Sequence, residues 1–468
     1  MPDSSEALPN SVAARDIASL AHPYANLDRH PETGPFVITR GEGVYVWDDA
    51  GKRYLEGMSG LWSASLGFSE PRLVAAATKQ MQTLPYSQLF GARSHEPAID
   101  LAEALLAIAP KGLSKVLFAN SGSEANDQAI KLVWYYHNAI GKPEKKKIIG
   151  RQRGYHGVTI ASASLTGLPA NHNDFDLPLD RFLHTDCPSW YHEAQAGESE
   201  AAFCERIVGN LAALIEREGP ETIAAFFAEP VMGAGGVIVP PKGYFAAVQA
   251  LLARHDILLV ADEVITGFGR TGNMFGCETY GIRPDILNCA KALSASFLPI
   301  SATLVSERVF EAMQAESRKL GVFGHGFTYG GHPVSAAVAL ETLKIYAERD
   351  IVGHVRSVAP RFQARLKALS QHPMVGETRG IGLMGAVEFA RDKATRTPFE
   401  ASLGVAGQVH TAVLEQGVIL RVIAGAICLC PPLIITTAQI DEMFGALARG
   451  LDKVQATLVA EGVVSSAG

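Results

Sequence analysis

Between about residue 70 and residue 335, segments with helical periodicity alternate with short runs that are apolar throughout. A strand that is apolar on both sides must be covered on both sides, and parallel strands need long crossover connections, usually helices. The alternation therefore predicts an α/β fold whose large domain has a mostly parallel sheet with helices on both faces. The predicted helices are 71–83, 96–109, 123–140, 200–217, 243–255 and 333–347, and the predicted strands are 115–118, 147–150, 222–227 and 257–261.

The two ends of the chain have a different pattern. Residues 36–56 contain short alternating runs with a turn at Asp48–Gly51, which predicts antiparallel strands. Long helical segments and a few strands, at 383–389 and 417–421, follow residue 335. We expect residues 1–65 and 335–468 to form a smaller α+β domain together, and residues 66–334 to form the large domain. No Gly/Ser/Pro-rich linker separates these parts, so they are expected to form one interlocked unit.

Charge and hydropathy exclude several classes of partner. The chain has 468 residues and a net charge of −7, and its longest basic run is Lys145–Lys147. Nucleic acids and anionic membranes are therefore not expected partners. No apolar run reaches the ~18–20 residues that a membrane helix needs. Residues 1–6 lack the basic and apolar segments of a signal peptide, which predicts a cytoplasmic protein.

The six cysteines are scattered and form no C-x-x-C pair. This spacing does not predict a disulfide framework, a structural zinc site or any other metal site. Reduced thiols in the core are the expectation.

A lysine and an aspartate carry the first chemical signal. Lys291 lies in a largely apolar stretch, and Asp262 ends a hydrophobic strand. Apolar surroundings disfavour a charged amine and make it a nucleophile, whereas a buried carboxylate needs a cationic partner. A Schiff-base lysine and a carboxylate facing a pyridinium nitrogen are what pyridoxal phosphate requires. Taken alone, Lys291 also fits an ordinary lysine that extends its amine to solvent.

Three further constellations follow predicted strands. Ser121 and Glu124 fit a helix-capping box, so that Gly122 and Ser123 lie where a helix N-terminus can hold a phosphate. Tyr155 follows the strand at 147–150, and Glu229 ends the strand at 222–227. The carboxyl ends of parallel strands line one crevice, where an aromatic ring can stack on a flat heterocycle. An ordinary helix cap and a loop tyrosine are the structural alternatives.

The run Gly267–Gly272 matches the dinucleotide pattern G-x-G-x-x-G. That pattern must lead from a strand directly into a helix, with an acid about 20 residues further on. Here the glycines continue as loop and the acid comes before them, so a nicotinamide site is not expected.

Together these motifs resemble the class III, or ω-, aminotransferases, which are pyridoxal-phosphate enzymes of fold type I. The resemblance extends from about Arg15 to Leu451. It is carried, in order and spacing, by Ser121–Asn126, Tyr155–Gly157, Glu229–Pro230, Asp262–Arg270, Ala290–Lys291 and Pro431–Leu433.

The resemblance implies a role for each site residue. Lys291 would bind the cofactor as a Schiff base and shuttle the proton, Asp262 would pair with the pyridine nitrogen, and Tyr155 would stack on the ring. Thr328 would reach the phosphate in a partner subunit, which implies a homodimer or a dimer of dimers with shared active sites. The other implied cofactor-binding residues are Ser121, Gly122, Ser123, Glu229 and, on the other face of the ring, Val264.

The implied activity is transfer of an amino group by a ping-pong aldimine/ketimine mechanism. The segments that contain Trp62 and Arg421 resemble those of the amine–pyruvate subgroup. In that subgroup the tryptophan covers the site and the arginine binds a carboxylate. Ala234 stands where relatives that use 2-oxoglutarate often have an acid. We therefore expect pyruvate as the acceptor and an ω-amino acid or primary amine as the donor, with Phe90 as a further substrate-pocket aromatic.

Alternatives remain on the same scaffold. Aminomutases, racemases and 2-oxoglutarate-using aminotransferases share the cofactor residues, and a catalytically silent homologue is disfavoured by the intact set Lys291, Asp262 and Tyr155. Two departures from the family pattern bear on substrate range: Ala292 replaces a usual glycine, and Ala426 replaces a polar residue. The sequence does not specify the physiological amine, the enantiopreference or the choice between dimer and tetramer.

Overall fold

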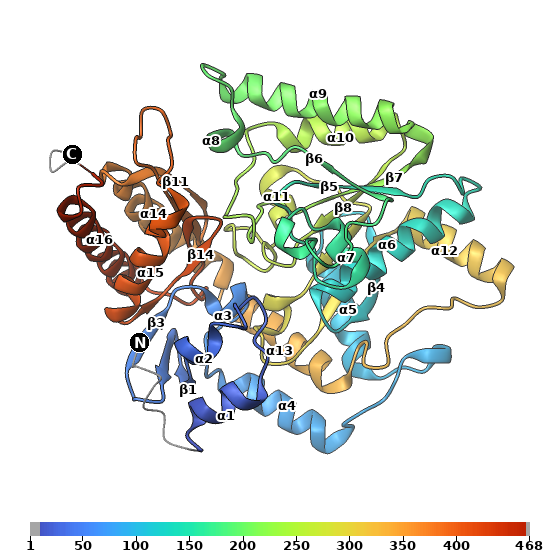
Figure 1. Cartoon of the computed structure of the whole chain (residues 1–468). Helices are drawn as coiled ribbons and strands as arrows, with labels where there is room; N and C mark the ends of the chain where they lie inside the picture. The colour runs from blue at the N-terminus through green and yellow to red at the C-terminus, as the bar shows by residue number, and fades with distance from the viewer. Residues whose placement is uncertain (1–9, 465–468) are drawn as a thin grey trace.

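The computed structural model describes residues 10–464 and has a seven-stranded sheet at its centre (Figure 1). The strand order is β4-β10-β9-β8-β7-β5-β6. Neighbours from β9 to β6 are parallel, whereas β10 runs antiparallel to both β9 and β4. The strands are β4 (Leu113–Ala119), β5 (Lys147–Arg151), β6 (Phe182–Thr185), β7 (Ile223–Ala228), β8 (Leu258–Asp262), β9 (Ile286–Cys289) and β10 (Ser301–Ser306).

Successive residues of the central strands enter different hydrophobic cores. Phe226 and Leu259 pack in one core with helices α9 and α10, and Phe227 and Leu258 pack in the other with α6 and α12. Figure 1 shows α9 and α10 at the top and α6, α7 and α12 on the other side of the sheet. Because side chains alternate along a strand, this two-sided burial explains why the strands are apolar throughout. The helices are α6 (Gly122–Ala139), α7 (Ile160–Leu165), α9 (Glu200–Glu218), α10 (Tyr244–Arg254) and α12 (Glu307–Leu320).

The predicted secondary structure of this region is largely confirmed. The helices predicted from periodicity have ends within one residue of those observed, and the predicted strands within two. The sequence did not predict β6, β9 or β10. The helices that complete the region are α4 (Pro71–Thr83), α5 (Glu96–Ile108), α8 (Trp190–Glu193), α11 (Gly276–Tyr280) and α13 (Pro333–Glu348).

Both ends of the chain contribute to the first of two smaller sheets. Its order is β1-β2-β3-β13, and β13 pairs parallel to β3, with Val418 opposite Leu55. The blue N-terminal elements therefore lie beside the orange C-terminal ones in Figure 1. These elements are α1 (Val12–Ser19), α2 (His30–Thr33), β1 (Ile38–Glu42), β2 (Tyr45–Asp48), β3 (Arg53–Glu56), α3 (Ser59–Trp62) and β13 (Val418–Ile419).

The second smaller sheet belongs to the C-terminal part and has the order β11-β12-β15-β14. The single strand predicted at 417–421 is wrong: the chain leaves the first sheet after Ile419, passes the buried Leu420, and joins the second sheet at Arg421. The elements are α14 (Ile351–Ala368), β11 (Val375–Ile381), β12 (Met384–Phe389), α15 (Val405–Glu415), β14 (Arg421–Ile423), β15 (Ala426–Leu429) and α16 (Thr437–Ala460).

No helix within residues 10–464 combines the length and the apolar character needed to cross a bilayer. Residues 1–6, on which the expected cytoplasmic location depends, lie outside the described part of the chain.

Candidate active site

A cavity of about 680 Å³ opens at the carboxyl ends of the parallel strands. Its volume is in the range of sites that enclose a small molecule with its cofactor. The segments that follow β4, β5, β7, β8 and β9 each contribute to its wall, as expected for a ligand crevice in a parallel sheet. The predicted site residues that line it are Trp62, Ser121, Gly122, Ser123, Tyr155, Glu229, Asp262, Val264, Lys291 and Arg421.

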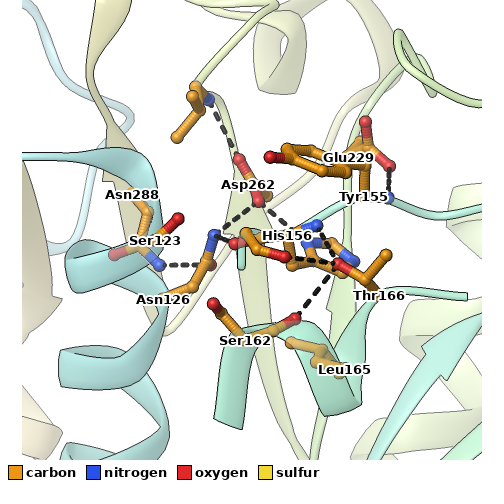
Figure 2. A network of polar contacts seen from close by, with 12 residues as sticks. Ser123, Asn126, Tyr155, His156, Ser162, Leu165, Thr166, Glu229, Asp262 and Asn288 are labelled. Carbon is orange, nitrogen blue, oxygen red and sulfur yellow. Dashed lines mark hydrogen bonds and ion pairs between the residues drawn. The ribbon is translucent and has the colours of Figure 1, made fainter. Parts of the chain in front are cut away.

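Asp262, the last residue of β8, is held by three donors (Figure 2). Nδ2 of Asn126 donates to its Oδ2 at 2.8 Å, and Nδ1 of His156 lies 2.8 Å from the same oxygen. The backbone N–H of Val264 donates to Oδ1 at 3.1 Å. The carboxylate is thus fixed in orientation, and Oδ1 retains a lone pair toward the cavity that Asp262 lines.

The hydrogen bonds continue into the sheet behind Asp262. Nδ2 of Asn288, on β9, donates to Oδ1 of Asn126 at 2.9 Å. Oγ1 of Thr303, on β10, donates to Oδ1 of Asn288 at 2.8 Å. All of these side chains are buried, so the network ties the orientation of Asp262 to three strands and helix α6.

Glu229 holds the segment that carries Tyr155. Its Oε1 accepts a hydrogen bond from the backbone N–H of Tyr155 at 3.1 Å, and its Oε2 accepts one from Gly233 at 3.2 Å. Burial raises the pKa of the Glu229 carboxyl above its usual value. Burial also raises the pKa of the Tyr155 phenol, and the hydroxyl of Tyr24 adds to this increase. Tyr155 therefore stays a neutral aromatic wall of the cavity.

Helix α6 begins at the cavity, after Ser121. Oγ of Ser121 accepts from the backbone N–H of Glu124 at 3.2 Å, which confirms the predicted N-cap. The reciprocal half of the predicted capping box is wrong, because the Glu124 carboxylate accepts from the backbone and side-chain N–H groups of Asn120 instead. Gly122 and Ser123 are in the first turn of the helix. Backbone N–H groups in this turn have no acceptor within the helix, so those of Gly122 and Ser123 can bind an anion.

Glycines keep this part of the cavity open. A side chain at position 122 would have its Cβ 3.1 Å from Cγ1 of Val264, so Gly122 allows Val264 to pack against the helix start. At Gly157, which has a φ of +138°, a Cβ would lie 2.6 Å from Oγ of Ser123. The space next to the α6 N-terminus thus depends on both glycines.

Lys291 follows β9 and lines the cavity. Burial lowers the pKa of its amine to about 8, and the nearby Asp262 and Glu229 carboxylates partly oppose this. Its backbone φ of +49° lies in the left-handed region, which is costly for a residue with a side chain and is common at functional sites. Ala292 does not have a positive φ and accepts a hydrogen bond from Tyr346 on its carbonyl, so this position does not require glycine.

Trp62 comes from helix α3, which follows β3 of the first smaller sheet, and Arg421 comes from β14 of the second. Trp62 ends α3 with a φ of +65° and is 2% exposed. The turn before it is held by Glu56, whose carboxylate accepts from the backbone N–H groups of Met58 and Gly60. The guanidinium of Arg421, the first residue of β14, has no hydrogen-bond or ion-pair partner among residues 10–464. It is therefore available to an anion in the cavity.

Two predicted residues do not line the cavity of their own chain. Thr328 is exposed, and its carbonyl accepts a hydrogen bond from the hydroxyl of Tyr86 at 3.0 Å. Phe90 is 49% exposed and packs next to Gly326, where a Cβ would lie 2.4 Å from its ring. The expected role of Phe90 as a substrate-pocket residue stays a prediction. Both residues belong to one exposed region instead.

Ala234 and Ala426, which depart from the family pattern, differ in their position relative to the cavity. Ala234 lines the cavity, so the absence of an acid there shapes the wall directly. Ala426 does not line it and packs in a buried cluster that contains Trp62.

Several site residues were missed by the sequence reasoning. Asn126 and His156 lie within motifs that were noted, but the contact of each with Asp262 requires the fold. Tyr24 lines the cavity from a loop and Asn171 from the end of a short 3-10 helix, Pro169–Asn171, and Nδ2 of Asn171 donates to the Tyr24 hydroxyl at 2.7 Å. No periodicity or motif marks either residue.

The glycine run at 267–272 forms a loop, with φ values of +104° at Gly269 and +91° at Gly272. Arg270 in this loop is buried and donates to the carbonyl of Pro431. The run does not lead into a helix, in agreement with the argument against a dinucleotide site.

Comparison with known proteins places this geometry in a family. The family described as aminotransferase class-III matches residues 27–451. Gamma aminobutyrate transaminase 3, chloroplastic, of Solanum lycopersicum is 51% identical over 442 residues, covering 93% of this chain and 85% of that protein. The omega transaminase of Pseudomonas jessenii, solved in complex with PMP (pyridoxamine phosphate), is 50% identical with a TM-score of 0.95, covering 96% of this chain and 99% of that chain. A transaminase solved with L-alanine is 57% identical with a TM-score of 0.89, covering 90% and 100%.

The cavity fits the cofactor of that family. It combines an amine of lowered pKa at Lys291, a fixed carboxylate at Asp262 and a helix N-terminus opened by glycines, each of which matches one part of pyridoxal phosphate. The likeness to the relatives covers nearly the whole chain. The chain therefore belongs to the class-III aminotransferases, enzymes of pyridoxal-phosphate fold type I that move amino groups between small molecules.

Proposed function

We propose that this aminotransferase uses pyruvate as amino acceptor, giving alanine, and an ω-amino acid or primary amine as donor. The unpartnered guanidinium of Arg421 carries this proposal. A cation at the wall of a partly apolar cavity is stabilised by an anionic ligand, and a guanidinium binds a carboxylate in a bidentate fashion. A keto acid bound through Arg421 presents its carbonyl carbon to the side of the cavity that Lys291 lines.

A single carboxylate suits this cavity better than two. The basic residues that line it are Arg421, Lys291 and His156, and His156 already contacts Asp262. If Lys291 serves the chemistry, Arg421 is the one cation left for substrate among the described lining residues. A second carboxylate, as in 2-oxoglutarate, would then be buried without a cation, which is costly.

The donor side is open to amines of several lengths. Leu61, Trp62, Leu168 and Ile300 give the cavity apolar walls beside Arg421. An ω-amino acid would place its carboxylate on Arg421 and its terminal amine near Lys291, whereas an apolar amine would lie along these walls with Arg421 turned aside. The names of the relatives, which include gamma aminobutyrate transaminases and a transaminase with L-alanine, support both an ω-amino acid donor and an alanine couple.

Each polar residue has a defined task in this reaction. Pyridoxal phosphate, when bound, supplies an aldehyde for the substrate nitrogen and a ring that accepts electron density. Gly122 and Ser123 would hold its phosphate, Tyr155 and Val264 would enclose its ring, and Asp262 would keep a proton on the ring nitrogen. Nζ of Lys291, with its lowered pKa, would accept the proton from the substrate carbon that bears the nitrogen and would then give it to the former aldehyde carbon of the cofactor.

A panel assay tests the substrate proposal. Cofactor-loaded enzyme is given pyruvate or 2-oxoglutarate with each of β-alanine, 4-aminobutyrate, putrescine, taurine and 1-phenylethylamine, and the amino acid formed is measured. Alanine should form at least about tenfold faster than glutamate, because the second carboxylate lacks a partner. Glutamate formation at an equal rate, or conversion of an amine without any keto acid as in a mutase, would contradict the proposal.

We also propose that two copies of the chain share their sites. An exposed apolar region consists of residues 84–90 and 320–329, which contact each other through the rings of Tyr86 and Tyr329, 6.0 Å apart. It contains Tyr329 at 61% and Phe90 at 49% exposure, and apolar exposure of this kind marks protein interfaces. Covering it with a second copy would bring Thr328 and Phe90 to the partner's cavity.

Light scattering on the loaded enzyme, with and without Tyr329→Asp, tests this arrangement. The wild type should have two or four times the mass of one chain, and the variant should be of lower mass and retain less cofactor. A wild-type monomer with full activity would contradict it.

A further inference from the structure

Asp16, His22 and His30 form a cluster outside the residues assigned to the reaction. Nε2 of His22 lies 2.8 Å from Oδ1 and 3.0 Å from Oδ2 of Asp16, and Nε2 of His30 lies 3.0 Å from Oδ1. The two imidazole rings are adjacent, with centroids 4.6 Å apart. Within residues 10–464 this is the one group of three such side chains whose donor atoms converge closely enough to hold an ion.

The donor types and spacing suit a specific class of ion. Two imidazole nitrogens and one carboxylate oxygen match zinc and similar divalent transition metals, whereas Mg²⁺ and Ca²⁺ prefer oxygen ligands. Around a tetrahedral ion with bonds of about 2.0 Å, neighbouring donors are about 3.3 Å apart. The two separations from Oδ1 of Asp16, 2.8 Å to His22 and 3.0 Å to His30, are a few tenths of an ångström shorter than this, and all three donor atoms lie within 4.8 Å of one another.

The burial of the cluster leaves one side open. The side chains of His30 and Asp16 are 11% and 13% exposed, and that of His22 is 35% exposed. An ion can enter past His22, and a water molecule can complete its coordination.

The cluster lies at the base of a loop that reaches the active site. Tyr24, between His22 and His30, lines the cavity with a φ of +55°, although it is 66% exposed. Its hydroxyl accepts a hydrogen bond from Asn171. Because Asp16 contacts both ends of this loop, a ligand that joins the three side chains closes the loop and restricts Tyr24.

We propose that Asp16, His22 and His30 bind one divalent transition-metal ion of the zinc class, which fastens the Tyr24 loop at the edge of the cavity. This site is independent of the substrate proposal, since none of its three residues lines the cavity.

Calorimetric titration with Zn²⁺ tests the site. Full-length, cofactor-loaded enzyme is first dialysed against a chelator. We expect one equivalent of zinc to bind saturably, and binding to weaken about tenfold or more when either histidine is replaced. The decisive variants are His22→Gln and His30→Gln, because a glutamine amide still donates to Asp16 but offers no imidazole nitrogen. They separate a metal site from a hydrogen-bonded cluster.

A matched control is available. His255 also lies next to a carboxylate, with Nε2 3.7 Å from Oε1 of Glu216, but has no second histidine. His255→Gln should leave the titration unchanged. Zinc should also raise the thermal unfolding midpoint of the wild type and of this control, but not that of His30→Gln. No saturable binding to the wild type, or equal binding to the double variant His22→Gln/His30→Gln, would overturn the proposal.

Discussion

Nδ1 of His156 lies 2.8 Å from Oδ2 of Asp262, and both side chains are buried. Among residues 10–464, Oδ1 accepts only the backbone N–H of Val264, so His156 occupies the side of the carboxylate that faces away from the proposed ring nitrogen. A donor at this position stabilises the ionised carboxylate and fixes its plane. His156 is therefore a positioning residue for Asp262.

Replacing this histidine should weaken cofactor binding. His156→Phe removes the donor, and we expect the dissociation constant for pyridoxal phosphate to increase about 10–100-fold, as for other supporting partners of a ligating group. His156→Asn places an amide N–H near the position of Nδ1 and should recover most of the affinity. Absorbance titration of the apoprotein gives both constants. Equal affinity in wild type and His156→Phe would exclude the role.

The lowered pKa of Lys291 predicts the pH dependence of cofactor capture. Only the neutral amine attacks an aldehyde, and this amine has a pKa of about 8 in place of the ordinary 10.5. Capture by the apoprotein should therefore rise with pH around a midpoint of about 8. The measurement is borohydride trapping at a series of pH values, followed by mass analysis of the modified peptide.

Lys291→Arg is the control for that experiment and should give no trapped adduct at this position. Label on another lysine of the wild type, or a midpoint near 10.5, would contradict the assignment of Lys291.

Arg421 should affect acceptors more than apolar donors. Arg421→Ala removes a charge-assisted contact of about 1.5–3 kcal/mol, which predicts a KM for pyruvate about 10–150-fold higher. The KM for 1-phenylethylamine should change little, because that amine has no carboxylate. Steady-state kinetics with each substrate varied gives the two values.

Arg421→Lys should recover only part of the pyruvate affinity, since an ammonium cannot bind a carboxylate with two parallel hydrogen bonds. An unchanged KM for pyruvate in Arg421→Ala would remove the basis of the proposed acceptor.

Glu56 predicts a pH effect on stability. Burial raises the pKa of its carboxyl to about 7 from the usual 4.5. Between these values the folded chain holds a proton that the unfolded chain has lost, so stability falls as pH rises from about 4.5 to 7. The full effect above pH 7 is about 3 kcal/mol. In Glu56→Gln this decline should be absent when thermal unfolding midpoints are compared across pH.

The exposed Glu461 provides a control, because Glu461→Gln should keep the wild-type pH profile. Glu56→Gln should also raise the KM for amines with little loss of cofactor, because the turn that carries Trp62 loses one of its two acceptors. An unaltered pH profile in Glu56→Gln would show that this carboxyl does not titrate in the folded chain.

Much of the large domain could be predicted because its physics is local. Strands such as β8 are buried on both sides and are therefore apolar up to their last residue, Asp262. Helices such as α6 have capping residues and periodicity. Strands β6 and β10 were not predicted because their ends are polar. Strand β9 was not predicted because its apolar character was attributed to the surroundings of Lys291.

The site could be predicted where a residue ends a parallel strand or lies within two residues of its end. Asp262 and Lys291 share one edge of the sheet for this reason, and the chain order places them there. Contacts between distant segments could not be predicted. Asn126 meets Asn288 across 162 residues, and the convergence of Asp16 with His30 depends on an irregular loop. Tertiary packing brings such pairs together, and no periodic pattern in the sequence marks them.

The parallel pairing of β3 with β13 constrains how the polypeptide can be made. During translation the first three strands emerge from the ribosome long before Val418 is synthesised. Until then, the backbone N–H and C=O groups on the outer edge of β3 have no partner strand. Synthesis that stops before this residue would leave that edge uncovered and free to associate with other nascent chains. Completion of the N-terminal sheet thus requires synthesis at least as far as Ile419, more than 350 residues after β3.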